Sequence, residues 1–145
     1  MAATVGPDGQ SGWLIEIGFN YTPVPGRVLA PGDSARETTE LAWTNACRLE
    51  LFVAEAERLR ASPVFGAARI GGRYGASRLA PTGFDGTSIG LAASLAAVSE
   101  LCQRPVARDL MALATVDSLG RLGRVEGLRS KIEVGIDWAP NLRRI

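Results

Sequence analysis

The chain has 145 residues, 46% of them hydrophobic, and a formal net charge of +1. This length and composition fit one globular domain with a core, and a charge near zero disfavours binding to nucleic acid or to an acidic membrane surface. Residues 1–12 lack the basic start and apolar stretch of a secretion signal and no run of eighteen apolar residues exists, so we expect a cytoplasmic protein without a membrane span.

The first half of the chain predicts strands followed by a long helix. We expect residues 1–12 to be a flexible lead, and the alternating residues 13–19 to form a strand with residues 27–30 as its hairpin partner. Ser34 and Glu37 have the spacing of a capping box. The helix that Ser34 would begin continues at helical period and should stop near Pro63.

The second half adds a buried helix, a pair of strands and a last helix. Residues 67–70 predict a weak strand, followed by a glycine-rich loop, and residues 85–102 predict a helix rich in alanine and leucine. Residues 110–116 and 121–125 are apolar runs of strand length, and residues 127–134 have helical character. This order indicates a two-layer α/β (α+β) domain over residues 13–145.

Cofactor sites find little support in the sequence. The glycines of residues 66–83 match neither a dinucleotide fingerprint nor a phosphate loop. The chain has no histidine, and its two cysteines lack a Cys-x-x-Cys spacing. We therefore expect neither a nucleotide cofactor nor a metal site.

The basic residues single out one lysine. Fifteen of sixteen are arginine, so Lys131 is the one side chain able to become a neutral amine base. Ser88 lies in Asp-Gly-Thr-Ser-Ile-Gly at residues 85–90, and without histidine it needs a lysine or a carboxylate for activation. In the first turn of the expected helix, free backbone amides would favour an oxyanion. The alternative is a plain helix cap at Asp85 and a solvated Lys131.

Two motifs in register resemble a known family. Residues 85–90 resemble the Asp-Gly-Pro-Ser-Ala-Gly nucleophile motif of the Lon protease proteolytic domain, and residues 126–131, Glu-Gly-Leu-Arg-Ser-Lys, resemble its Gly-Gly-Leu-Lys-Glu-Lys. Residues 32–37 are similar to the Gly-Asp-Val-Met-Lys-Glu that opens the family's long helix. The resemblance covers residues 13–145 and implies a Lon-like two-layer fold, of a type also found in a ribosomal protein domain, that is short at its carboxyl end.

The resemblance also implies an activity and a site. It makes Ser88 the nucleophile, Lys131 the general base and Asp85 an auxiliary acid, with Gly86 and Thr87 in the oxyanion region. The implied function is a Lon-like serine endopeptidase without an ATPase module of its own, acting on polypeptides. Relatives form rings, so the resemblance implies a homo-oligomer or a partner chain, such as a separate ATPase.

Several residues depart from the family's pattern. Leu113 stands where the family has a threonine that can hold the lysine, and Thr87 replaces the proline before the nucleophile. Glu126 replaces a glycine, and its carboxylate should raise the pKa of Lys131. The alternative function is therefore a non-catalytic Lon-fold interaction or scaffold domain.

Overall fold

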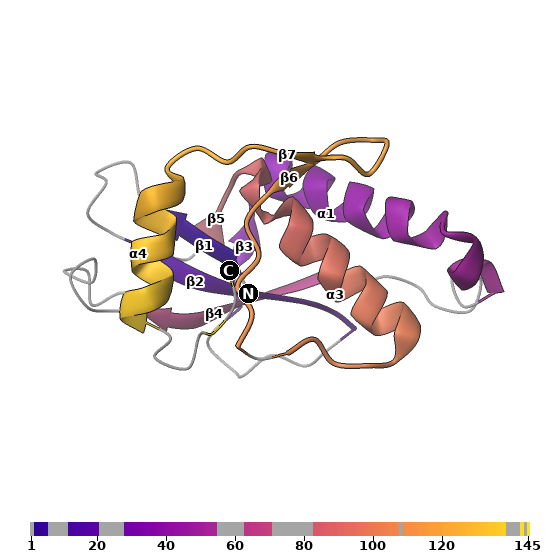
Figure 1. Ribbon diagram of the computed structural model, residues 1–145, viewed down its shortest axis with the longest axis horizontal. Helices are drawn as coiled ribbons and strands as arrows, with labels where there is room; N and C mark the ends of the chain where they lie inside the picture. The colour runs from indigo at the N-terminus through magenta and orange to yellow at the C-terminus, as the bar shows by residue number, and fades with distance from the viewer. Residues whose placement is uncertain are drawn as a thin grey trace.

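The computed structural model describes residues 2–5, 12–20, 28–54, 63–70, 83–107, 109–138, 143 and 145 (Figure 1). Mixed helices and small sheets make the protein an α+β molecule, which confirms the expected class at this level. Its elements are β1 (Ala2–Val5), β2 (Gly12–Phe19), β3 (Ala30–Pro31), α1 (Asp33–Cys47), η1 (Glu50–Phe52), β4 (Pro63–Ile70), β5 (Gly83–Phe84), η3 (Thr87–Ile89), α3 (Gly90–Cys102), β6 (Thr115–Val116), β7 (Leu122–Gly123) and α4 (Leu128–Trp138).

The main sheet is antiparallel and has the strand order β1-β2-β4. Along β2, Ile15 and Phe19 are buried and Glu16 is exposed, while Leu14, next to a register shift, is buried as well; the strand expected at residues 13–19 is confirmed. The expectation of a flexible lead is wrong for β1. Ala2 is fully buried and pairs with Ile15, so the sheet incorporates the first described strand.

The expected hairpin between β2 and residues 27–30 is also wrong in the described part. The Leu29 amide donates to the Phe65 carbonyl oxygen of β4 at 2.9 Å, and Ala30 pairs with Gly83 in the parallel ladder of β3 and β5. Leu29 is 2% exposed and belongs to the same core cluster as Phe65. Burial of this leucine therefore places the segment beside β4 instead of β2.

Both ends of α1 differ from the expectation. Its N-cap is Gly32, in an extended conformation, and Ser34 lies inside the first turn. The prediction of a capping box that begins at Ser34 is therefore wrong. The helix ends at Cys47, because the next residues turn the chain at an extended Leu49 and bring Phe52 back into the core. Phe52 packs in one cluster with Phe19 and Ala46.

Helices cover the sheet from several directions (Figure 1). Helix α3 packs against β2, α1 packs against α3, and α4 packs against β1 and β2. As expected, the small residues of α3 are buried. The main core cluster joins these layers and contains Ala2, Ile15, Leu29, Ala35, Phe65, Ile89, Ala92 and Ala112.

The remaining elements agree with the sequence in kind and differ in extent. Strand β4 begins at Pro63, before the expected residue 67, and the glycine-rich loop at residues 71–82 lies outside the described residues. Within 110–116 only Thr115–Val116 forms a paired strand, although Met111 and Ala112 are buried. Helix α4 is confirmed and longer than expected. Within the part of the chain described, no helix has the length and apolar character needed to cross a membrane.

Candidate active site

Ser88 occupies a tight turn between β5 and α3. Gly86 has φ of 120°, a backbone conformation that glycine adopts and other residues rarely do. Residues Thr87–Ile89 then form the short helix η3, which leads directly into α3. Ile89 is 2% exposed in the main core cluster, whereas Ser88 is half-buried and Thr87 exposed. The core thus anchors the turn and leaves its serine accessible.

The backbone around Ser88 is suited to bind an oxyanion. No side chain caps η3 at Gly86, and the Gly90 amide donates to the Thr87 carbonyl oxygen. Amides in the first turn of a helix have no partner within the helix and lie at the positive end of its dipole. Gly86 and Thr87, which the sequence analysis places in the oxyanion region, lie beside Ser88 in this turn, and the Gly86 amide donates to the Asp85 carboxylate.

The first turn of α3 is pressed against the segment before β7. The Leu91 amide donates to the Ala114 carbonyl oxygen at 3.1 Å. A Cβ atom at Gly90 would lie 2.7 Å from the Val116 backbone nitrogen, closer than such atoms approach in proteins. A side chain at residue 90 would therefore force the backbone to shift, and this close approach fixes where the serine turn lies.

Asp85 faces helix α1. Its Oδ1 atom accepts a hydrogen bond from the Ala35 amide at 2.9 Å. Backbone hydrogen bonds from Ala35 and Gly86, followed by hydrogen bonds from Ser34, hold the pKa of Asp85 below its usual value. Asp85 therefore provides the cap for α1 that the sequence assigned to Ser34.

Lys131 lies on the face of α4 that packs against the sheet. Its amide donates to the carbonyl oxygen of Gly127, whose φ is 61°, just before the helix. Val134, one turn later on the same face, is fully buried. Lys131 itself is half-buried.

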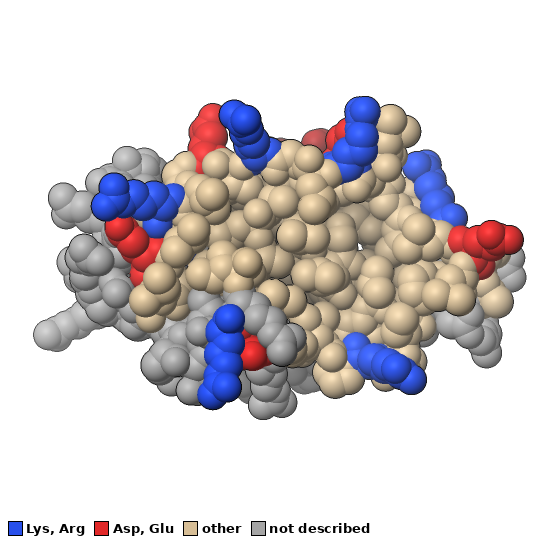
Figure 2. Space-filling model, in the orientation of Figure 1, with Lys and Arg blue, Asp and Glu red and all other residues tan. Residues whose placement is uncertain are grey.

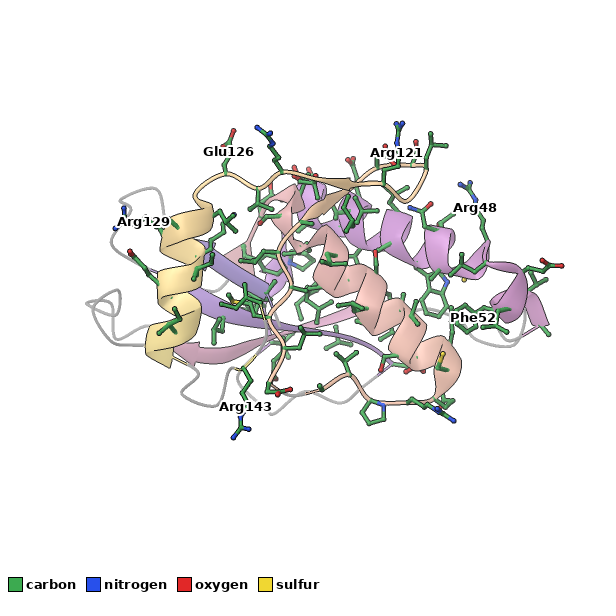
Figure 3. The ribbon with its side chains drawn as sticks, viewed as in Figure 1. Arg48, Phe52, Arg121, Glu126, Arg129 and Arg143 are labelled. Carbon is green, nitrogen blue, oxygen red and sulfur yellow. The ribbon has the colours of Figure 1, made fainter. Side chains whose placement is uncertain are left out.

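Two opposing effects set the pKa of Lys131. Desolvation lowers it, Glu126 raises it, and the net shift is downward. Figure 3 shows Glu126 on the loop before α4, directed away from the sheet. The sequence correctly indicated that Glu126 would oppose deprotonation, but burial is the larger effect.

The Ser88 turn and the Lys131 helix meet at one strand. Both η3 and α4 pack against β1. Among the described residues no hydrogen bond joins the Ser88 Oγ atom to the Lys131 Nζ atom. Asp85 is not among the groups that shift the pKa of Lys131. The fold therefore places the Ser88 turn and the Lys131 helix against the same strand, β1, and it directs Asp85 to α1.

In the view of Figure 2 the charged side chains of the described residues lie around the rim, and the centre of this face is uncharged. A cavity of about 570 Å³ lies between β2, α3 and residues 105–112, and neither Ser88 nor Lys131 lines it. Within the described ranges, no three Cys, Asp or Glu side chains cluster as a metal site would require.

Gly32 is the site residue whose role the sequence reasoning missed. The sequence of residues 32–37 predicts the opening of a helix, but nothing in it indicates contact with Asp85. A Cβ atom at Gly32 would lie 2.5 Å from the Asp85 Cγ atom. Comparison of the chain with models of protein families and with curated proteins found no match.

Proposed function

We propose that this chain is a Lon-like serine endopeptidase in which Ser88 and Lys131 form the catalytic dyad. The observation that carries the proposal is the placement of Lys131. The only lysine of the chain is half-buried, has a lowered pKa, and lies on a helix that packs against the same strand as the Ser88 turn. A lowered lysine pKa is what a general base requires near neutral pH.

The reaction proceeds in two steps. The neutral Lys131 amine takes the proton of Ser88 Oγ while this oxygen attacks the peptide carbonyl carbon, and amides of the η3 turn stabilise the oxyanion. The ammonium then gives its proton to the departing amine, which leaves an acyl-enzyme. Lys131, neutral again, activates a water molecule that hydrolyses the ester and releases Ser88. Catalytic hydrogen bonds often tighten only when substrate binds, so the missing Ser88–Lys131 bond is compatible with this role.

The partners of the proposed enzyme follow from the resemblance of residues 85–90 and 126–131 to the Lon proteolytic domain. The substrate is a polypeptide, and the chain acts as a homo-oligomer or with a partner chain, possible partners including a separate ATPase. The second candidate function is a non-catalytic scaffold domain. It is favoured by the apolar Leu113 at the position where the family has a lysine-holding threonine.

Labelling with a serine-directed fluorophosphonate, together with hydrolysis of casein, tests the dyad. Ser88→Ala and Lys131→Ala should each lower the hydrolysis rate by a factor on the order of 10⁴ or more. Lys131→Arg should be equally inactive, because a guanidinium does not lose its proton. All three should keep the wild-type circular dichroism spectrum.

Two exposed positions provide matched controls. Ser118→Ala removes another serine, and Arg129→Ala removes another cation from α4, where Figure 3 shows Arg129 on the outer side. Both should keep wild-type activity. Hydrolysis retained in Lys131→Arg would exclude lysine from the mechanism, and a wild-type chain that neither labels nor hydrolyses casein would favour the scaffold.

A further inference from the structure

Two residues far apart in the sequence share one small space at the start of α1. A Cβ atom at Gly32 would lie 2.5 Å from Cγ and 2.7 Å from Cβ of Asp85. Gly32 has φ of −70° and ψ of 176°, a conformation open to any residue. The backbone therefore does not explain this glycine, whereas the Asp85 side chain does.

Strand pairing and hydrogen bonds hold the segment before Ser88 against the start of α1. Strand β5 pairs with β3 through Ala30 with Gly83 and Pro31 with Phe84. The Gly32 amide donates to the Phe84 carbonyl oxygen at 2.7 Å. The Ala35 amide donates to Asp85 Oδ1 at 2.9 Å. Asp85 is the last attachment before Gly86, after which the chain turns into η3.

This arrangement gives the carboxylate partners in α1. Its hydrogen-bond donors are the Ala35 and Gly86 amides and groups of Ser34. The Ala35 amide requires an oxygen acceptor of the right shape and place, which the Oδ1 atom of an asparagine also provides. If Asp85 acted on Lys131 through its charge, Asp85→Asn would abolish that effect. If Asp85 serves as a hydrogen-bond acceptor for α1, Asp85→Asn would preserve it, so this variant distinguishes the two roles.

We propose that Asp85 is a positioning residue that fastens the Ser88 turn to the N-terminus of α1, and that Gly32 provides the space for its side chain. The inference rests on the proposed function for its effect on catalysis. Without the attachment, Gly86 is free to change the direction of the turn, and the serine oxygen moves away from its reaction position. Misplacement by about 1 Å can reduce a rate about 100-fold.

The test compares Asp85→Asn, Asp85→Ala and Gly32→Ala with the wild type in casein hydrolysis. Asp85→Asn keeps an acceptor for the Ala35 amide and should retain the rate within about threefold. Asp85→Ala and Gly32→Ala should lower kcat by about 10- to 100-fold with KM unchanged. In the Asp85→Ala background the Cγ and Oδ1 atoms are gone and only the Cβ contact at 2.7 Å remains, so adding Gly32→Ala should cost less than it does in the wild type.

Hydrogen exchange of the Ala35 amide provides a measurement that does not depend on activity. Exchange should be accelerated in Asp85→Ala and Gly32→Ala and should stay near wild type in Asp85→Asn. If Asp85→Asn is as inactive as Asp85→Ala while its Ala35 amide stays protected, the charge of Asp85 acts in the chemistry and positioning is overturned.

The exchange measurement also separates failure of this inference from failure of the proposed function. A wild-type chain without hydrolase activity would end the proposed function, yet acceleration of Ala35 exchange by Asp85→Ala and Gly32→Ala would still support the attachment. Unchanged Ala35 exchange in both variants would overturn the attachment, whether or not the chain is an enzyme.

Discussion

Glu126 and the protein interior act on the Lys131 amine in opposite directions, and desolvation of Lys131 outweighs the attraction of the Glu126 carboxylate. The folded-state pKa of Lys131 therefore lies below the ordinary value of 10.5. A general base works in its neutral form, so the rate should rise with pH above neutrality and level off below pH 10.5. A flat profile between about pH 6 and 9 would contradict a lysine base.

Glu126→Gln should move this profile to lower pH. The substitution removes the effect that raises the Lys131 pKa and leaves the effect that lowers it. Exposed charges interact with about 1 kcal/mol or less, so the shift should be about half a pH unit. Glu40→Gln, at an exposed position of α1, is the control and should leave the profile in place. An unchanged profile in Glu126→Gln would mean that Glu126 does not act on the base.

Gly90→Ala tests the close approach that positions the Ser88 turn. The added methyl would meet the backbone of Val116 at 2.7 Å and of Ala114 at 3.1 Å, so the helix must shift. We expect a loss of about 1–3 kcal/mol in the free energy of unfolding, measured with urea, and slower acylation of Ser88. Helix propensity alone predicts the opposite, a gain of up to about 1 kcal/mol, so increased stability would disprove the contact.

Asn45→Ala tests how the β6–β7 hairpin is attached. The Asn45 Nδ2 atom donates to the Asp117 carbonyl oxygen at 3.0 Å, which links α1 to the hairpin that precedes α4. Losing this hydrogen bond should cost about 1 kcal/mol of unfolding free energy. Thr44→Ala, at the neighbouring exposed position, should cost less. Equal effects of the two substitutions would show that Asn45 contributes only through helix propensity.

Elements with local signals could be predicted from the sequence. The alternation of residues 13–19 predicts β2 because one face of the strand is buried at Ile15 and Phe19. The turn before β7 carries Gly120 with φ of 76°, and α4 follows Gly127 with φ of 61°. In both places a glycine marks a conformation that the chain needs locally.

Elements that depend on contacts between distant residues could not be predicted from the sequence. Strand β1 exists because Ala2 pairs with Ile15, and four small or β-branched residues carry no signal of that pairing. Helix α1 ends at Cys47 without a glycine or proline, and Phe52 lies buried beside Phe19 and Ala46, residues distant from it or on another turn of the chain. Tertiary packing overrides local propensity at both places.

The candidate site likewise contains residues that could be predicted from the sequence and a contact that could not. Ser88 and Lys131 could be found from residue chemistry, because a chain with no histidine and one lysine leaves few bases. The partner of Asp85 could not be found, since the Ala35 amide lies fifty residues away. A capping residue supplied from another segment leaves no pattern in the helix that it caps.

The last prediction concerns assembly, which we propose from the exposed apolar side chains. Leu49, Leu51 and Val53 are 50%, 80% and 49% exposed around η1, and Ile145 is 58% exposed, while Leu142 lies outside the described residues. Exposed apolar residues clustered as they are around η1 often mark interfaces. Sedimentation velocity should therefore show a species larger than a monomer, and Leu51→Ser or Ile145→Ser should shift it toward the monomer by removing apolar contact area.

Peptidase activity should then depend on protein concentration, and ATP added to the purified chain should not stimulate it, because the sequence contains no phosphate loop. Glu37→Gln, at an exposed polar position of α1, should leave the sedimentation unchanged and serves as the control. A fully active monomer at all concentrations would disprove self-association. Stimulation of the isolated chain by ATP would show that these 145 residues contain a nucleotide-binding site without a recognisable phosphate loop. The proposed enzyme would then not need a separate ATPase.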